Sequence, residues 1–184
     1  MGDRHREAAG EAPPASPGAE LIRDAAAGDA DALAAIMALH DASMRRICMV
    51  VTGNAALVEE AVQAAWVRAW RHLGSLRDPD RLRPWLMSVA ANEARQQVRA
   101  AYRRTAHERR TDVSRRGTDP AARAELVDLA AAVGRLDTDE RRLLALRYVA
   151  DLTSEEIGRE LGMTAAAVRG RLARIVERLR RELA

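Results

Sequence analysis

The chain has 184 residues, of which 48% are hydrophobic and mainly Ala, Leu and Val, a composition that favours helix over sheet. All 30 basic residues are arginines, the formal net charge is +3, and the single cysteine, Cys48, excludes an intramolecular disulfide. This composition predicts an all-α protein. Since neither a signal peptide nor an apolar run of membrane-spanning length is visible, we also predict that the protein is cytoplasmic, with no membrane insertion.

The chain is predicted to begin with a disordered tail over residues 1–19, because this segment is rich in Pro, Gly, Ser and Ala. A first helical domain is predicted over residues 20–101. Its opening apolar stripe, with a break at Gly28 and Asp29, consists of Leu21, Ile22, Leu33, Ile36, Met37 and Leu39. A separate helix, closed by Gly53, carries Met44, Ile47, Met49 and Val50.

The next two helices of this domain are separated by a turn-rich loop. Asn54 is a predicted N-cap, and apolar residues then recur at three- and four-residue steps over 57–73, which is the period of a helix. Two prolines mark residues 74–84 as the loop, and another apolar helix is predicted over 85–98.

The composition changes between residues 99 and 123, where eight arginines accompany three acidic residues and large apolar side chains are almost absent. We therefore predict a flexible basic linker over residues 102–123. A second apolar set beyond it predicts another helical domain over residues 124–184. The expected architecture is two small helical domains, separately folded and joined by the linker.

The second domain contains a predicted helix-turn-helix. Thr153 and Glu156 have the spacing of a capping box and open a short helix. Gly162 stands where a left-handed turn residue is needed, and Thr164 can cap the helix that follows. In this motif the second helix is the one that enters the major groove of DNA.

The helix after Thr164 has two different faces. At about 100° per residue, its apolar side consists of Val168, Leu172, Ile175 and Leu179. The opposite side presents Ala166, Arg169, Gly170, Ala173 and Arg174, with Arg171 at the flank. A merely solvated face would more usually alternate acids with arginines, yet no acid lies between Met163 and Ile175. The pattern favours DNA reading over a solvated surface.

Two parts of the chain resemble one protein family, in the family's own order. Residues 136–183, "LDTDERRLLALRYVADLTSEEIGRELGMTAAAVRGRLARIVERLRREL", are similar to the −35-binding domain of bacterial sigma factors of the extracytoplasmic-function type. The segments "LVEEAVQAAWVRAWRHL" and "RPWLMSVAANEARQQVR" are similar to the same family's polymerase-binding and −10-binding domain. The resemblance implies a transcription initiation subunit that binds RNA polymerase core, recognises the −35 and −10 elements and assists promoter melting.

The resemblance also implies the protein partners. The helix "EEAVQAAWVRAW" matches the family's surface for the clamp coiled coil of the largest polymerase subunit, with candidate contacts at Glu60, Gln63, Arg68 and Trp70. Trp66 is expected in the core instead. Ala64 stands where the family often has an acid, which removes one expected polar contact. The polymerase flap, promoter DNA and, in many members of the family, an anti-sigma factor are the other implied partners.

The loop and the helix after it match the family's −10-binding part. The candidate residues are Arg77, Asp80, Arg81, Asn92, Arg95 and Arg99. Asn92 can pair with the edge of an unstacked base, whereas Arg95 and Arg99 are placed for phosphates. Trp85 is expected in the core.

The same resemblance implies a −35 site on the helix after Thr164. The candidate residues are Thr164, Ala166, Arg169, Gly170, Arg171, Ala173 and Arg174. Arg169 and Arg174 match base-reading positions, and Arg171 is expected on phosphate. Gly170 and Ala173 depart from the serine and the larger residue common in the family, so the DNA sequence that is read is not predicted.

Two other functions fit parts of the chain. A stand-alone helix-turn-helix regulator explains residues 136–183 but leaves the N-terminal helices without a role, and a protein-interaction domain would not read DNA. An enzyme is not expected, because the four histidines are scattered, without a nucleophile–base pair, a phosphate loop or metal-ligand spacing. No catalytic residue, metal or other cofactor is expected, and Cys48 is expected to be a small buried side chain.

Overall fold

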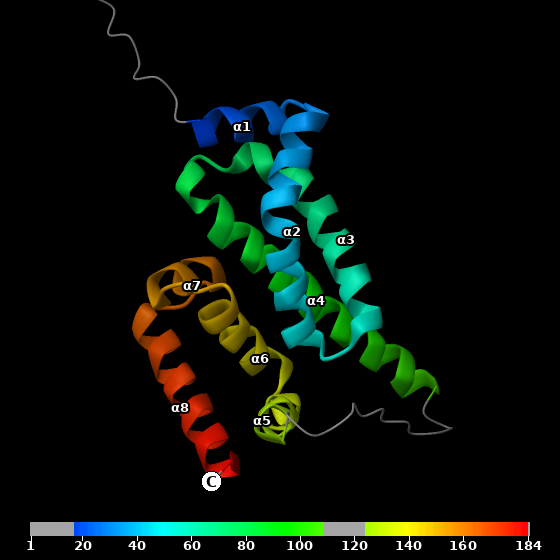
Figure 1. Cartoon of the computed structure of the whole chain (residues 1–184), viewed down its shortest axis with the longest axis vertical. Coiled ribbons are helices and arrows are strands. Elements are labelled where there is room, and N and C mark those ends of the chain that lie inside the picture. The colour runs from blue at the N-terminus through cyan, green and yellow to red at the C-terminus, as the bar shows by residue number, and fades with distance from the viewer. Residues whose placement is uncertain (1–16, 109–123, 184) are drawn as a thin grey trace, which may run out of the picture.

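The computed structural model of the chain describes residues 17–108 and 124–183, and every regular element within these two ranges is a helix (Figure 1). The predicted all-α class is confirmed. Most of the predicted tail, and residues 109–123 of the predicted linker, lie outside the described residues. Within the described ranges, no helix combines the length and the apolarity needed to cross a bilayer.

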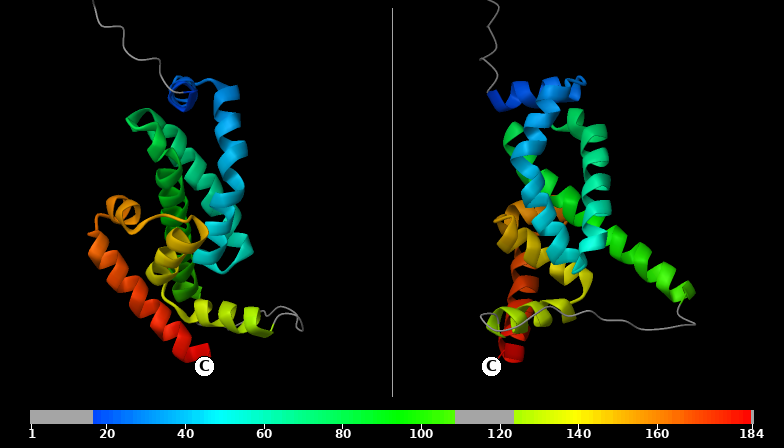
Figure 2. Two further views of the ribbon diagram at one scale, coloured as in Figure 1. Left: turned by 60° about the vertical axis from the view of Figure 1, so that its left-hand side comes forward. Right: turned by 45° about the vertical axis from the view of Figure 1, so that its right-hand side comes forward.

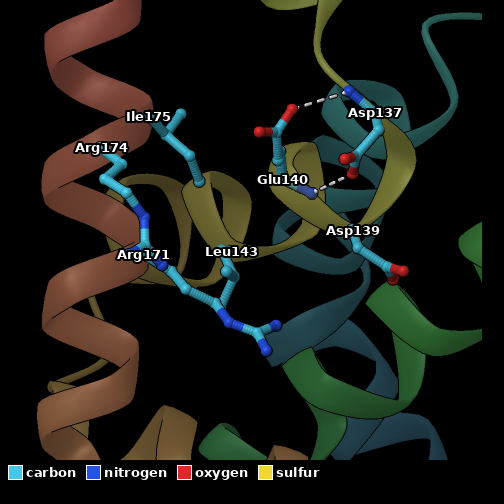
Figure 3. Close-up of a pocket in the computed structure, with 7 residues that line it drawn as sticks. All are labelled: Asp137, Asp139, Glu140, Leu143, Arg171, Arg174 and Ile175. Atoms are coloured by element: carbon cyan, nitrogen blue, oxygen red, sulfur yellow. Dashed lines mark hydrogen bonds between the residues drawn. The ribbon is translucent and has the colours of Figure 1, made fainter.

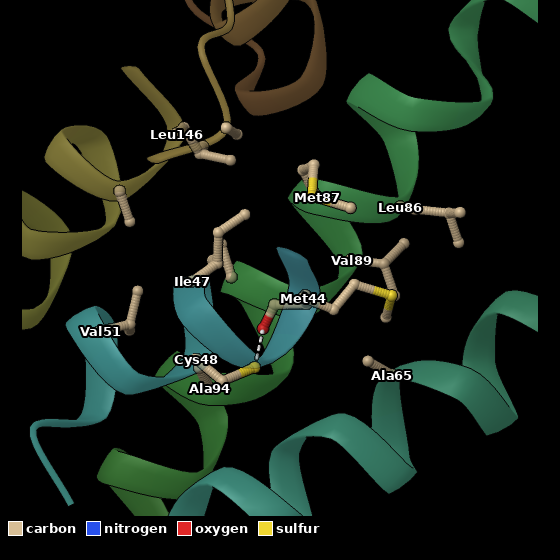
Figure 4. Close-up of a cluster of buried hydrophobic side chains, with 14 of the residues drawn as sticks. Met44, Ile47, Cys48, Val51, Ala65, Leu86, Met87, Val89, Ala94 and Leu146 are labelled. Carbon is tan, nitrogen blue, oxygen red and sulfur yellow. Dashed lines mark hydrogen bonds between the residues drawn. The ribbon is translucent and has the colours of Figure 1, made fainter. Parts of the chain in front are cut away.

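The first domain consists of three long helices that pack on one another, with a short helix across one end (Figure 1). Its elements are α1 (Pro17–Ala26), α2 (Ala30–Thr52), α3 (Ala55–His72), the 3₁₀ turns η1 (Leu73–Ser75) and η2 (Pro79–Arg81), and α4 (Leu82–Glu108). The buried side chains of α2 and α4 meet in the centre of this bundle (Figure 4).

α2 is one helix of 23 residues where two were predicted. Asp29 caps its start by accepting hydrogen bonds from two amides of the first turn at 2.9 Å, and Gly53 ends it with a φ of 62°. No glycine or proline interrupts the sequence between them, so nothing breaks the helix. Its buried side carries Ile36, Met44, Ile47, Cys48 and Val51. Met37, Leu39 and Met49, which the prediction placed in apolar stripes, are exposed instead.

The other predicted features of the first domain are mostly confirmed. Asn54 caps α3 by accepting from the amide of Ala56 at 2.9 Å. Trp66 is buried, and its Nε1 donates to Asp41 at 2.9 Å, while Trp85 is partly buried against the core. α4 begins at Leu82, three residues earlier than expected, and continues through the start of the predicted linker.

Cys48 lies inside the core of the first domain, with its Sγ 3.6 Å from the carbonyl oxygen of Ala90 (Figure 4). Burial disfavours the thiolate and raises the pKa of Cys48 to about 12. We expect the native protein at pH 8 to react with an aromatic disulfide reagent at least about 100-fold more slowly than the unfolded protein, because the thiolate is the nucleophile. The absorbance of the released thiolate measures both rates. Similar rates would contradict the buried position, and Cys48→Ala supplies the blank.

The second domain contains four α-helices and one π-helical turn. Its elements are α5 (Ala124–Arg135), α6 (Thr138–Leu144), the π turn η3 (Ala145–Val149), α7 (Ser154–Leu161) and α8 (Ala165–Leu183). A capping box that the sequence reading did not single out, Asp137 with Glu140, opens α6. α8 packs on α5, α6 and α7.

The two domains pack against each other. α6 and η3 lie against α2 and α4, and α7 lies against α4 (Figure 2). Leu146 of η3 is fully buried and faces Ile47 and Met87, and the buried side chains of both domains form one contiguous cluster (Figure 4). The architecture of two helical domains is confirmed, but the expectation that each closes its own core is wrong. Apolar periodicity along one helix does not show which other element covers its buried side chains.

Candidate nucleic-acid and polymerase interfaces

The predicted helix-turn-helix is formed by α7 and α8, and its three local signals are confirmed. Thr153 and Glu156 exchange hydrogen bonds as a capping box, the backbone amide of Thr153 donating to the Glu156 carboxylate at 2.7 Å. Gly162 is left-handed, with a φ of 66°. Thr164 Oγ1 accepts from the amide of Ala167 at 3.1 Å. These contacts determine the direction in which α8 leaves the turn.

α8 has the two faces that its sequence predicts. Val168, Leu172, Ile175 and Leu179 are buried. All seven predicted −35 residues are exposed, namely Thr164, Ala166, Arg169, Gly170, Arg171, Ala173 and Arg174. Arg169 pairs with Glu155 of α7 at 3.2 Å, but both side chains are more than half exposed. Such a pair contributes about 0–1 kcal/mol, so a base or a phosphate can displace it.

Arg171 and Arg174 line a hollow of about 240 Å³ between α8 and the first turn of α6 (Figure 3). The other polar residues of this hollow are Asp137, Asp139 and Glu140, which belong to α6 and its N-cap. The absence of acids between Met163 and Ile175 therefore does not mean that the arginines of this stretch lack acidic neighbours. Packing brings three carboxylates to one flank of the helix, and Glu155 of α7 pairs with Arg169 on its exposed side.

A second hollow, about 630 Å³, lies along α8 and includes side chains that the sequence analysis did not select. Arg147, Tyr148 and Arg180 line it together with Arg169 and Ala173. Tyr148 is 63% exposed, and the Arg147 guanidinium lies 5.9 Å from the centre of its ring. In the sequence, Arg147 and Tyr148 follow the apolar run of residues 143–146 and carry no signal of their own for DNA binding. Tertiary packing of η3 on α6 and α7 places them at the same hollow as Arg169.

The predicted −10 residues lie in the loop between α3 and α4 and along one side of α4. Arg77 and Asp80 are exposed in the loop. Asn92, Arg95 and Arg99 follow each other at three- and four-residue steps and therefore share one side of the helix. Asn92 and Arg95 are half-buried, and Arg99 is exposed.

Two of the predicted −10 arginines are paired with carboxylates of the second domain. Arg81 donates to Glu160 of α7, and Arg95 donates to Asp139 of α6 at 3.1 Å. The side of α4 that carries Arg95 thus faces α6. The sequence contained no signal for either pair, because the partners are 79 and 44 positions apart.

Three of the four predicted polymerase contacts share an exposed stripe of α3. At three- and four-residue steps this stripe contains Glu60, Gln63, Val67 and Trp70. Trp70 is 56% exposed and Val67 is 48% exposed. Arg68 lies away from the stripe, where it donates to the buried carboxylate of Glu93 on α4 at 3.2 Å. Arg68 therefore links α3 to α4 by an ion pair. Val67 is an apolar member of the stripe that the sequence analysis did not select.

Both domains match models of known protein families. The family described as Sigma-70 region 2 matches residues 37–104, and the family described as Sigma-70, region 4 matches residues 126–179. The two matches thus cover the first domain from within α2 to α4 and the second from α5 to α8.

Individual relatives align with most of the chain. The RNA polymerase sigma factor CarQ of Myxococcus xanthus is 32% identical over 167 residues, which is 88% of this chain and 92% of CarQ. The ECF RNA polymerase sigma factor SigL of Mycobacterium tuberculosis is 30% identical over 86% of this chain and 93% of SigL. Among solved structures, CnrH in complex with the cytosolic domain of CnrY has a TM-score of 0.67 and 28% identity, covering 89% of this chain and 95% of CnrH.

Proposed function

This chain belongs to the sigma-70 family of RNA polymerase sigma factors, in its extracytoplasmic-function group, and from that premise we propose that its two domains bind different promoter elements. The first domain binds RNA polymerase core through α3 and captures the −10 element through the loop before α4 and one side of α4. The second domain reads the −35 element with α8. The chain is a transcription initiation subunit and carries out no catalysis itself.

The exposed face of α8 is the observation that carries this proposal. Between Ala165 and Arg174 the other exposed residues of this helix are small, as at Gly170 and Ala173, so that the backbone can approach base edges. Arg169 and Arg174 are the proposed base readers. Arg171 and Arg180 of α8 and Arg147 of η3 are proposed as phosphate contacts, because they line the two hollows beside this face.

The −10 element is proposed to bind as a partly unstacked single strand. Asn92 supplies an amide for a base edge, while Arg77, Arg81, Arg95 and Arg99 supply charge for phosphates. Asp80, exposed in the same loop, is a further candidate for base contact. Binding an extruded base offsets part of the few kcal/mol needed to unstack it.

The proposed protein partners are two parts of the core enzyme and one separate protein. Within the core, the clamp coiled coil of the largest subunit fits the α3 stripe, and the flap is proposed to contact the second domain. CnrH has been solved with the cytosolic domain of CnrY, and the sigma factor RpoE from Bartonella quintana with the anti-sigma factor NepR. We extend a protein partner of this kind, an anti-sigma factor, to the present chain.

The function is tested by reconstituting the chain with bacterial core polymerase. We expect the complex to select, from a randomised DNA library, fragments that share two elements at one spacing, and to transcribe those fragments only when both components are present. Failure to bind core would contradict the proposal. A stand-alone regulator, the alternative, would select a single element and would not need core.

Trp70→Ala is expected to weaken binding to core by about 1 kcal/mol, roughly fivefold, because a large aromatic side chain that becomes buried in an interface contributes disproportionately to affinity. Leu39→Ala is the matched control, since Leu39 is 70% exposed and belongs to α2, not to the α3 stripe. Titration of labelled chain with core measures both affinities. Equal losses in the two variants would remove α3 as the docking surface.

A further inference from the structure

Among the described residues, two ion pairs join the first domain to the second, and both use arginines of the proposed −10 set. Arg81, at the end of η2, donates through Nη2 to Glu160 of α7. Arg95 of α4 donates through Nη2 to Asp139 of α6 at 3.1 Å. In both pairs the first domain supplies the cation and the second domain supplies the carboxylate.

We propose that these two pairs, Arg81–Glu160 and Arg95–Asp139, form an ionic clasp that holds the two domains closed and keeps carboxylates where promoter phosphates would otherwise bind. The identity of the excluded ligand rests on the proposed function. The closing of the domains by the clasp does not, because it concerns only contacts within the chain.

In the clasp, the carboxylates of the second domain compete with DNA phosphates for the guanidinium groups of Arg81 and Arg95. A carboxylate and a phosphate both present anionic oxygens to the guanidinium group, and one guanidinium fork cannot engage both in the same geometry. α6 and α7 also pack on α4, whose side with Asn92 and Arg95 faces the second domain. In the closed arrangement this side of α4 is therefore blocked both by charge and by bulk.

Several features indicate that the closed arrangement can open. The Nε of Arg81 and the Nε of Arg142, on α6, are buried without a hydrogen-bond partner among the described residues. Burial, with a smaller effect of Arg95, lowers the pKa of Arg142 to about 10, so its charge is poorly accommodated there. The Asp139 side chain is 53% exposed, which leaves its pair screened by salt. A ligand that binds only the open form can then shift the equilibrium.

The clasp is tested by measuring the distance between the domains. Dyes on Leu39→Cys and Leu183→Cys, both exposed positions, report it by energy transfer, and Cys48 is buried and does not compete for the label. We expect Glu160→Gln with Asp139→Asn to lower the transfer efficiency at low salt, where the parent chain stays closed. The same variant should bind single-stranded −10 oligonucleotides about three- to tenfold more tightly, since more of the chain is competent to bind.

Two further variants make the result specific. Arg81→Gln breaks the Arg81–Glu160 pair from its other side and should also lower the transfer efficiency. Glu155→Gln removes an acid whose partner, Arg169, lies in the same domain, so it should leave the distance unchanged. Unchanged transfer in the Glu160→Gln, Asp139→Asn variant and in Arg81→Gln, or an equal effect of Glu155→Gln, would overturn the clasp. Opening without any gain in oligonucleotide binding would keep the clasp and count against the proposed −10 role.

Discussion

Arg174→Ala is expected to weaken binding to one class of −35 sequence by about 1–3 kcal/mol and to leave binding to random DNA nearly unchanged. Arg174 is exposed on α8, one turn beyond Gly170, at a point where small neighbours allow a close approach to the bases. A guanidinium that donates two hydrogen bonds to a guanine loses both when it is truncated, and the cost falls only on sites that contain that guanine.

The measurement compares the parent chain and the variant on a panel of −35 duplexes with each position changed in turn. Arg171→Ala is the contrasting variant, because a phosphate contact should weaken binding to every sequence alike and reduce the salt dependence by about one counterion. If Arg174→Ala showed that uniform pattern, Arg174 would be a phosphate contact, and the base-reading role would pass to Arg169 alone.

Gly158→Ala is expected to destabilise the protein by about 1–3 kcal/mol, although it replaces one small residue by another within a helix. A Cβ at position 158 would lie 2.6 Å from the backbone carbonyl oxygen of Met163. That atom belongs to the turn of the helix-turn-helix and cannot move aside as a side chain can. The Met163 amide also donates to the Gly158 carbonyl at 2.8 Å, so displacing the turn disturbs the end of α7 as well.

Gly170→Ala is the matched control for thermal unfolding. Gly170 lies in the middle of α8, and a Cβ built there meets nothing within 4 Å. Alanine at this position should therefore stabilise the helix by about 0.5–1 kcal/mol. The two substitutions are thus expected to shift the melting temperature in opposite directions. A Gly158→Ala variant as stable as the parent would show that the turn can relax around the added methyl group.

Comparison of α2 with the helix-turn-helix shows how far the sequence alone could predict the fold. The helix-turn-helix was predicted correctly, because Thr153, Gly162 and Thr164 act on backbone groups only a few positions away. α2 was predicted as two helices, and Met37 and Leu39, which were predicted in an apolar stripe, are exposed. Ala-rich helices carry apolar residues on several sides, so the pattern alone does not identify the side that is covered.

The candidate sites show the same limit. Every predicted −35 residue is exposed, because the apolar face of α8 is clear from its period. Arg68 was grouped with Glu60 and Trp70, but it turns to the buried carboxylate of Glu93. A charge partner on another helix cannot be read from spacing along one helix.

By itself the sequence determined that this chain is helical, where the caps and the turn of its helix-turn-helix lie, and which family it belongs to, because those properties depend on short segments and on motifs in order. Only the tertiary structure decided that the two domains share one buried cluster and that Arg81 and Arg95 meet Glu160 and Asp139. Contacts between residues 44 or more positions apart are set by how whole helices pack, and side-chain packing has no local signature in the chain.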